Sequence, residues 1–237
     1  GKRHADLNLL ATRRFVKQMY RLLKKDGLGK INFNHNGESP STAGFVDIRT
    51  DGEELIWEGK DHYRRITPDY FRSTYAQTEY GIPYSFHAVF HYSWRRAGEV
   101  VPVREVLMMT LPHRVSFTLA YDAEVLPVWQ IVDPWWTTSD FRAYWYPNCP
   151  VSTSAPTQVL SSVFIKPEEK KALVIFANWS YDKQSVQWMI DTGKLGFKVK
   201  NISEIDTVTC EPRPVEIDKL MMTLEPRDFA IVELRGE

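Results

Sequence analysis

Apolar residues recur every three or four positions between Asp6 and Lys25, a pattern that predicts an amphipathic helix. Asp6 is placed to cap its start and Gly27 to end it. Residues 30–34 then alternate between polar and apolar, as in a short strand, and the polar cluster 35–40 follows. This succession of helix, turn, strand and loop predicts an α/β unit.

A second unit of the same kind begins at Thr67, which can cap a helix that has Pro68 in its first position and continues to about Tyr80. Residues 84–90 are expected to form the next strand. A short helix over 102–111 and a strand over 114–119 follow. The segment up to Trp136 is apolar, but Pro127 weakens its helix prediction.

Beyond about residue 141 the pattern changes to short segments rich in β-branched and aromatic residues, separated by turn residues. The expected strands cover 158–165, 171–178, 184–190, 215–224 and 229–234. We therefore predict an α/β domain over residues 1–140 and an antiparallel β-sandwich over residues 141–237.

The strand over 171–178 is apolar at both sets of alternating positions. We expect Leu173, Ile175 and Ala177 to point into the sandwich, and Val174 and Phe176 to pack against a second apolar layer. Such a strand is usually central and covered on both faces.

The composition narrows the classes of function. The 237 residues carry 30 basic and 30 acidic side chains, a balance that argues against binding to nucleic acid. No apolar run is long enough to span a membrane. The sequence has no dinucleotide-binding, P-loop or serine-hydrolase motif, and we expect no cofactor.

Two residue types leave alternatives open. Cys149 and Cys210 are too few for a disulfide framework, and they are either buried thiols or one bridge. His87 and His91 stand four residues apart, but no third ligand lies nearby. We therefore expect satisfied polar histidines there and no metal.

The longest loop covers residues 35–67 and is rich in acidic and aromatic side chains. Long loops are usually functional, and loops that follow parallel strands carry the site in barrel folds. Two carboxylates in such a loop could cleave a glycosidic bond, whereas the simpler interpretation is a solvated acidic loop.

The segments Asp47-Ile48-Arg49-Thr50-Asp51-Gly52-Glu53 and Thr67-Pro68-Asp69-Tyr70-Phe71, with Tyr63 between them and Gly81-Ile82-Pro83-Tyr84 after them, resemble a known pattern. They are similar to the second half of the barrel in bacterial glycoside hydrolases related to exo-acting β-N-acetylgalactosaminidases. The sandwich is similar to the C-terminal domain of many glycosidases. In this interpretation the chain is α/β plus all-β, with a partial (β/α) barrel before the sandwich.

Two departures qualify the resemblance. Thr50 stands where the relatives tend to have Trp, so this loop lacks the aromatic ring on which a sugar would stack at that position. A closed eight-stranded barrel also needs about 200–250 residues, more than the 140 before the sandwich. The chain therefore resembles the C-terminal part of a larger enzyme.

The resemblance implies Asp47 and Glu53 as site carboxylates, and five further residues as sugar contacts: His35, Asn36, Tyr63, His87 and Trp94. It implies carbohydrate as the ligand, a secreted or periplasmic location, and a partner that is either the N-terminal portion of the same enzyme or a second copy. A non-catalytic carbohydrate-binding or scaffolding protein, and a structural sandwich with an unrelated α/β cap, stay open as alternatives.

Overall fold

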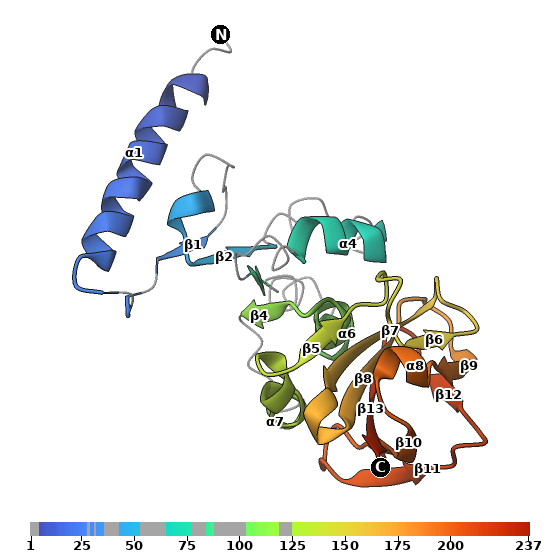
Figure 1. The fold of residues 1–237 in the computed structure, drawn as a ribbon. Helices are drawn as coiled ribbons and strands as arrows, with labels where there is room; N and C mark the ends of the chain where they lie inside the picture. The colour runs from blue at the N-terminus through green and yellow to red at the C-terminus, as the bar shows by residue number, and fades with distance from the viewer. Residues whose placement is uncertain are drawn as a thin grey trace. The chain divides into compact units, whose positions relative to one another are not determined.

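The computed structural model describes residues 5–27, 29–30, 32–35, 43–52, 65–76, 84–87, 103–118 and 125–237. The chain divides into two compact units (Figure 1). The first comprises residues 1–93 and 115–119, and the second comprises residues 94–114 and 120–237.

The first unit contains a four-stranded sheet in which every neighbouring pair is parallel. Its strands are β1 (Phe33–His35), β2 (Ile48–Asp51), β3 (Tyr84–His87) and β4 (Ser116–Thr118), and they lie side by side in chain order. The carboxyl ends of all four strands consequently meet at one edge of the sheet. The predicted α/β organisation is confirmed, and β1, β3 and β4 are shorter or later than expected. The expectation of a loop without secondary structure over residues 35–67 was wrong, because β2 lies within it and is a strand through its pairing with β1 and β3.

The helices of the first unit begin close to where the sequence predicts, although Asp6 lies inside α1 and is not its N-cap. Helix α1 spans Ala5–Lys24, and Gly27 follows it with a φ of 115°, a conformation that favours glycine. Helix α4 spans Pro68–Tyr75, and the Thr67 hydroxyl accepts the backbone N–H of Tyr70 at 3.1 Å. It ends at Tyr75 rather than near Tyr80, and a short 3₁₀ turn, η1 (Ala43–Phe45), precedes β2.

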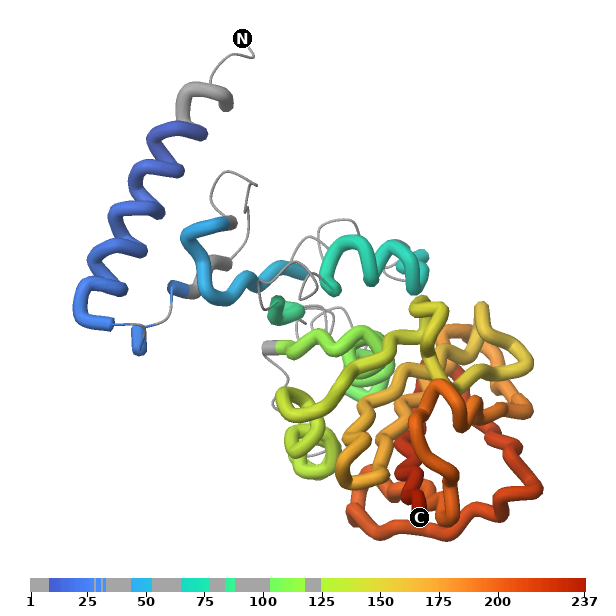
Figure 2. The backbone as a smooth tube through the Cα atoms, in the orientation of Figure 1, coloured from blue at the N-terminus to red at the C-terminus, as the bar shows by residue number. Residues whose placement is uncertain are grey.

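The second unit is built on two antiparallel sheets. Figure 2 traces its backbone from residue to residue. The six-stranded sheet has the order β11-β10-β13-β8-β7-β5, and the three-stranded sheet has the order β12-β9-β6. The strands are β5 (Asp140–Arg142), β6 (Val151–Thr153), β7 (Val159–Lys166), β8 (Lys171–Asn178), β9 (Gln184–Ile190), β10 (Val199–Ile205), β11 (Pro212–Val215), β12 (Met221–Leu224) and β13 (Phe229–Gly236). The predicted sandwich is thus present.

Short helical elements complete the described part of the second unit. They are α6 (Val103–Thr110), η4 (Leu111–His113), α7 (Val125–Trp136) and α8 (Thr192–Leu195), and a 3₁₀ turn, η5 (Pro167–Glu169), joins β7 to β8. Pro127 does not prevent α7, because it lies in the first turn, where no backbone N–H is needed.

Helix α6 and η4 belong to the compact unit of the sandwich, although their sequence positions fall within residues 1–140. Both contact β8, and the Ser162 hydroxyl of β7 donates to the carbonyl oxygen of Pro112 at 2.7 Å. A domain division at residue 140 therefore stays a prediction, while the compact units divide the chain differently.

The core of the sandwich corrects one prediction and confirms another. Val174 and Phe176 point into the core between the sheets, where the Phe176 ring lies 5.1 Å from that of Trp188. Leu173 and Ile175 are equally buried but lie outside that core, on the face of β8 that carries α6 and η4. Strand β8 is covered on both faces as expected, whereas the assignment of the two faces was wrong, because alternation alone does not say which face points inward.

Two further expectations are corrected near the C-terminus. Residues 215–224 do not form one strand, because β11 and β12 belong to different sheets and Lys219 closes a turn onto the carbonyl of Glu216 at 3.0 Å. Strand β10 was not predicted. Cys149 and Cys210 are both free, which excludes the bridge between them.

Candidate functional site

A row of polar residues runs across the parallel sheet, from the end of β1 to the start of β4. His35 of β1 pairs in register with Thr50 of β2, Thr50 with Ser85 of β3, and Ser85 with Ser116 of β4. Four neighbouring strands therefore each place a polar residue at the same level. Ligand sites of parallel sheets form at the carboxyl edge, where the last strand residues are His35 of β1, Asp51 of β2, His87 of β3 and Thr118 of β4.

The aromatic contacts of β3 show which face of the sheet the row occupies. Tyr84 and Phe86 face α4, since their rings lie 5.6 Å and 4.9 Å from the ring of Tyr75. Side chains alternate along a strand, so Ser85 and His87 point to the other face. The sheet thus has an aromatic face under α4 and a polar face opposite.

Two side-chain hydrogen bonds connect neighbouring strands of the sheet to β3. Thr50, which is only 1% exposed, donates from its hydroxyl to the carbonyl oxygen of Ser85 at 2.7 Å. Ser116 donates from its hydroxyl to the carbonyl oxygen of Tyr84 at 3.1 Å. These side chains rigidify the strand ends, and His87, half-buried at the end of β3, adds an imidazole that can donate or accept hydrogen bonds.

Gly52, directly after β2, lets two strand ends approach closely. Its φ is 137°, and a Cβ at this position would lie 2.7 Å from the carbonyl oxygen of His87. No larger residue fits there without displacing backbone. The glycine therefore sets the spacing between the loop after β2 and the end of β3.

Asp47 is the one predicted carboxylate that the structure describes, and it lies at the opposite edge. It immediately precedes β2, where its carboxylate accepts the backbone N–H of Asn32 at 2.7 Å and pairs with Lys24 at 2.8 Å. The hydrogen bond from Asn32, with that from Lys24, lowers the pKa of Asp47 below its usual value. The expectation that Asp47 lies at the carboxyl ends of the strands was wrong, because it joins the amino ends of β1 and β2.

The remaining predicted residues divide between two groups. His35 is the last residue of β1 and His87 the last residue of β3, and β2 lies between these two strands. Four of the predicted site residues lie outside the described residues, namely Asn36, Glu53, Tyr63 and Trp94. His91 lies outside them as well. Asp51, which sequence reasoning did not select, ends β2 on the aromatic face and pairs with Arg49 at 3.6 Å.

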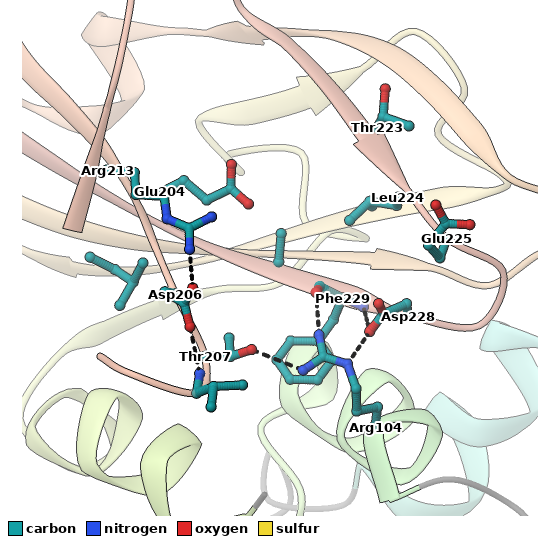
Figure 3. A pocket seen from close by; sticks show the side chains of 13 residues that line it. Arg104, Glu204, Asp206, Thr207, Arg213, Thr223, Leu224, Glu225, Asp228 and Phe229 are labelled. Carbon is teal, nitrogen blue, oxygen red and sulfur yellow. Dashed lines mark hydrogen bonds and ion pairs between the residues drawn. The ribbon is translucent and has the colours of Figure 1, made fainter. Parts of the chain in front are cut away.

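A concavity of about 270 Å³ lies in the second unit (Figure 3). Arg104 of α6 holds one side of it, donating to Asp228 at 2.7 Å, to Thr207 at 2.9 Å and to the carbonyl of Phe229 at 3.2 Å. Asp206 pairs with Arg213 across the same pocket. Arg104 is more than a hundred residues from each of its partners in the chain, and the pairing of β10 with β11 that brings Asp206 near Arg213 was not predicted, so local sequence patterns do not indicate this pocket.

The part of the chain that the structure describes contains neither a cluster of metal ligands nor a membrane-spanning helix. No group of three or more His, Cys, Asp or Glu side chains there is arranged to hold a metal ion. No helix in the described part of the chain is long and apolar enough to cross a membrane.

Comparison with known families bears directly on the second unit. Residues 124–209, from α7 to the loop after β10, match the model of the glycoside hydrolase 123 C-terminal domain. The resemblance to the C-terminal part of a glycoside hydrolase is confirmed. No curated protein matches the sequence of the chain.

Solved structures of glycoside hydrolases share the fold. The chain is similar to the maltogenic α-amylase AmyB of Thermotoga neapolitana (12% identity, TM-score 0.56, 95% of this chain and 59% of that one). It is similar to a GH27 β-L-arabinopyranosidase of Geobacillus stearothermophilus (13% identity, TM-score 0.57, 94% of this chain and 54% of that one). It is also similar to α-galactosidase I of Mortierella vinacea (9% identity, TM-score 0.58, 97% of this chain and 64% of that one). The chain therefore spans between about half and two-thirds of the length of these enzymes.

Proposed function

We propose that this C-terminal portion of a glycoside hydrolase contributes one side of a sugar-binding cleft, formed at the carboxyl edge of β1 to β4. The cleft becomes complete when the remaining strands of a (β/α)₈ barrel join the sheet. The substrate is a carbohydrate, and the reaction is hydrolysis of a glycosidic bond.

The observation that carries this proposal is the pairing of β1 to β4, four parallel strands that lie side by side in chain order and all end at one edge of the sheet. Consecutive strands of a (β/α)₈ barrel pair in parallel in this way, and its active site lies at their carboxyl ends. The family match over residues 124–209 and the shared fold of three glycoside hydrolases support the same assignment.

The roles follow from position relative to this edge. Glu53, one residue after Gly52, is the leading candidate for one of the two carboxyl groups that glycoside cleavage requires, and the other comes from the missing strands. Asp47 has a structural role instead, because it is engaged with Lys24 at the opposite edge. Five residues are proposed as hydrogen-bonding or stacking contacts to the sugar: His35, Asn36, Tyr63, His87 and Trp94.

Hydrolysis of aryl glycosides of hexoses and N-acetylhexosamines tests the proposal. The 237-residue chain alone should be inactive, whereas a longer polypeptide that supplies the other barrel strands should turn over one of these substrates. In the longer protein, Glu53→Gln should lower kcat by about 10²–10⁴-fold, the usual contribution of a carboxyl group that transfers protons. Asp47→Asn serves as the matched control and should leave kcat within a few-fold.

One observation favours the non-catalytic alternative, a carbohydrate-binding protein. Among the described residues at the carboxyl edge, the only carboxylate is Asp51, and it pairs with Arg49 on the aromatic face. Calorimetric titration of the longer protein with the same sugars distinguishes the two functions. Binding without turnover, unchanged in Glu53→Gln, would establish the alternative and refute catalysis.

A further inference from the structure

The pocket of about 270 Å³ in the second unit lies where β10 and β12 end and β11 and β13 begin (Figure 3). We call it the sandwich pocket. Both sheets line it, because β10, β11 and β13 belong to the six-stranded sheet and β12 belongs to the three-stranded sheet. Small-molecule sites measure about 300–1,000 Å³, so a pocket near the lower limit of that range suits a ligand of one ring.

Two charged residues of this pocket stand on the inner face of the six-stranded sheet. Ile202 of β10 is buried in the core between the sheets, and Glu204, two residues farther along the strand, shares its face. Arg213 of β11 pairs in register with Glu204 and lies beside it (Figure 3). The inner faces of a sandwich are ordinarily apolar. Charged residues at these two positions therefore keep this end of the sandwich open to a polar ligand.

The polar groups of Glu204 and Arg213 are available to such a ligand. In the part of the chain that the structure describes, no hydrogen bond or ion pair engages the carboxylate of Glu204, which is an exposed residue. Arg213, whose side chain is 72% exposed, pairs with Asp206 through Nη2 and has further N–H donors to offer. Asp206 is occupied, because its carboxylate also accepts the backbone N–H groups of Val208 and Thr209 at 2.9 Å and 3.0 Å.

The charge of the lining decides between classes of ligand. Acidic side chains outnumber basic ones, since Glu204, Asp206, Glu225 and Asp228 stand against Arg104 and Arg213. Lys183 pairs with Glu225 at 2.5 Å, and the pocket still keeps a negative charge, which disfavours an anion. No cluster of metal ligands is found within the described ranges. A neutral ligand that needs both a hydrogen-bond acceptor and a donor is therefore favoured.

The pocket also has an apolar floor. Leu224 of β12 and Ala230 of β13 line it, are 4% and 7% exposed, and belong to the core between the sheets. A sugar ring carries C–H groups on its faces and hydroxyl groups around its rim. It can therefore rest on this floor while one hydroxyl donates to the Glu204 carboxylate and a neighbouring one accepts from the Arg213 guanidinium.

We infer that the sandwich pocket binds one neutral sugar residue. This site belongs to the second unit, whereas the proposed cleft belongs to the first, and neither proposal depends on the other. A non-catalytic site of this kind holds an enzyme on a substrate that carries many sugar residues, because a second contact raises the effective concentration at the first.

Titration of the ¹⁵N-labelled 237-residue chain, followed by two-dimensional NMR, tests this inference. The probes are glucose, galactose, N-acetylglucosamine and N-acetylgalactosamine, with glucuronate as the anionic comparison and putrescine as the cationic one. At least one neutral sugar should shift the amide resonances of residues 204–208 and 223–230 saturably. The expected Kd is about 1–10 mM, because so small a ligand makes few contacts. Glucuronate should bind more weakly than that sugar, because the pocket repels its charge.

Glu204→Ala should raise the Kd by about 10-fold or more, because a sugar hydroxyl loses a charged acceptor. Glu216→Ala is the matched control and should leave the Kd unchanged, since Glu216 is an exposed acid of the same unit that pairs with Lys219 outside the pocket. Arg213→Gln should also weaken binding. Glu204 is exposed, so its replacement should preserve the fold, and the dispersion of the same spectra verifies this for each variant.

Each of the following results would overturn the inference. The neutral sugars could produce no saturable shift in the folded chain, or shifts that Glu204→Ala leaves unchanged. Saturation by putrescine alone would assign the pocket to cations, and glucuronate that binds as tightly as the neutral sugars would contradict the argument from charge. Shifts at His87 in place of residues 204–230 would locate the sugar at the proposed cleft, and the proposed function would still stand.

Discussion

The Arg227 guanidinium donates to the Glu105 carboxylate inside the second unit, where the two side chains are only 6% and 10% exposed. Arg227 also donates to the carbonyl oxygen of Trp179 at 3.0 Å and lies between the rings of Trp179 and Tyr181, at 5.2 Å and 5.0 Å. Glu105 belongs to α6, so this pair ties that helix to the turn between β12 and β13.

Removing one partner of this pair should therefore destabilise the second unit. Glu105→Ala leaves the Arg227 charge buried without its counter-ion, which should cost about 3–5 kcal/mol of unfolding free energy. Glu225→Ala is the control, because its pair with Lys183 is about 60% exposed and such pairs contribute about 1 kcal/mol or less. Urea unfolding followed by tryptophan fluorescence measures the unfolding free energy of both variants. Equal losses of stability would contradict the claim that the buried pair contributes more than the exposed one.

The core of the sandwich permits a second test. Phe176→Ala removes a fully buried ring between the sheets and should cost about 3–5 kcal/mol, because the cavity beside Trp188 cannot collapse completely. Met189→Ala on β9, where the side chain is 58% exposed, should change stability by about 0.5 kcal/mol or less. If thermal or urea unfolding shows similar losses for both variants, the packing described for β8 is incorrect.

Local signals in the sequence predicted much of the fold. The bounds of β8 and β9 agree with the structure, because dense β-branched and aromatic residues are bracketed by turn residues. Thr67 and Pro68 likewise located the start of α4. Strand β10 escaped notice because most of its side chains are polar or half-exposed, so its pairing with β13 and β11 is what makes it a strand.

The candidate site was harder to predict, for a geometrical reason. Asp47 and Glu53 both stand in the same long segment, and spacing alone does not say where the strand between them begins. Because β2 starts at Ile48, Asp47 falls at the amino edge of the sheet, while Thr50 and Asp51 reach the carboxyl edge. The pairing of Arg104 with Asp228 depends on tertiary contacts and has no local signature.

The position of Asp47 makes a prediction about pH. Its pKa is lowered in the folded protein, so its stabilising effect is complete above the unfolded pKa of about 3.9 and disappears as the pH falls through the folded value. The difference in unfolding free energy between the wild type and Asp47→Asn should thus be largest near neutral pH and shrink in acid. Urea unfolding between pH 7 and pH 3 measures it. Asp26→Asn, at an exposed acid that pairs with Lys30 at 3.6 Å, should show a smaller difference at neutral pH, and an equal one would argue against an anchoring role for Asp47.

Gly52 offers the sharpest test of the carboxyl edge, because two separate features forbid a side chain there. An alanine would have to adopt a φ of 137°, and its Cβ would lie 2.7 Å from the carbonyl oxygen of His87 and 2.9 Å from the Phe86 ring. Gly52→Ala should therefore cost at least about 1 kcal/mol of unfolding free energy and should shift the NMR resonances of His87. Gly44→Ala is the matched control, since nothing lies within 4 Å of a Cβ at that position, and it should leave those resonances in place. In an extended and active enzyme, Gly52→Ala should also raise KM for the sugar, because it displaces the end of β3, which carries His87, one of the proposed sugar contacts. A Gly52→Ala protein with wild-type stability and unchanged His87 resonances would show that the two strand ends do not approach each other as described.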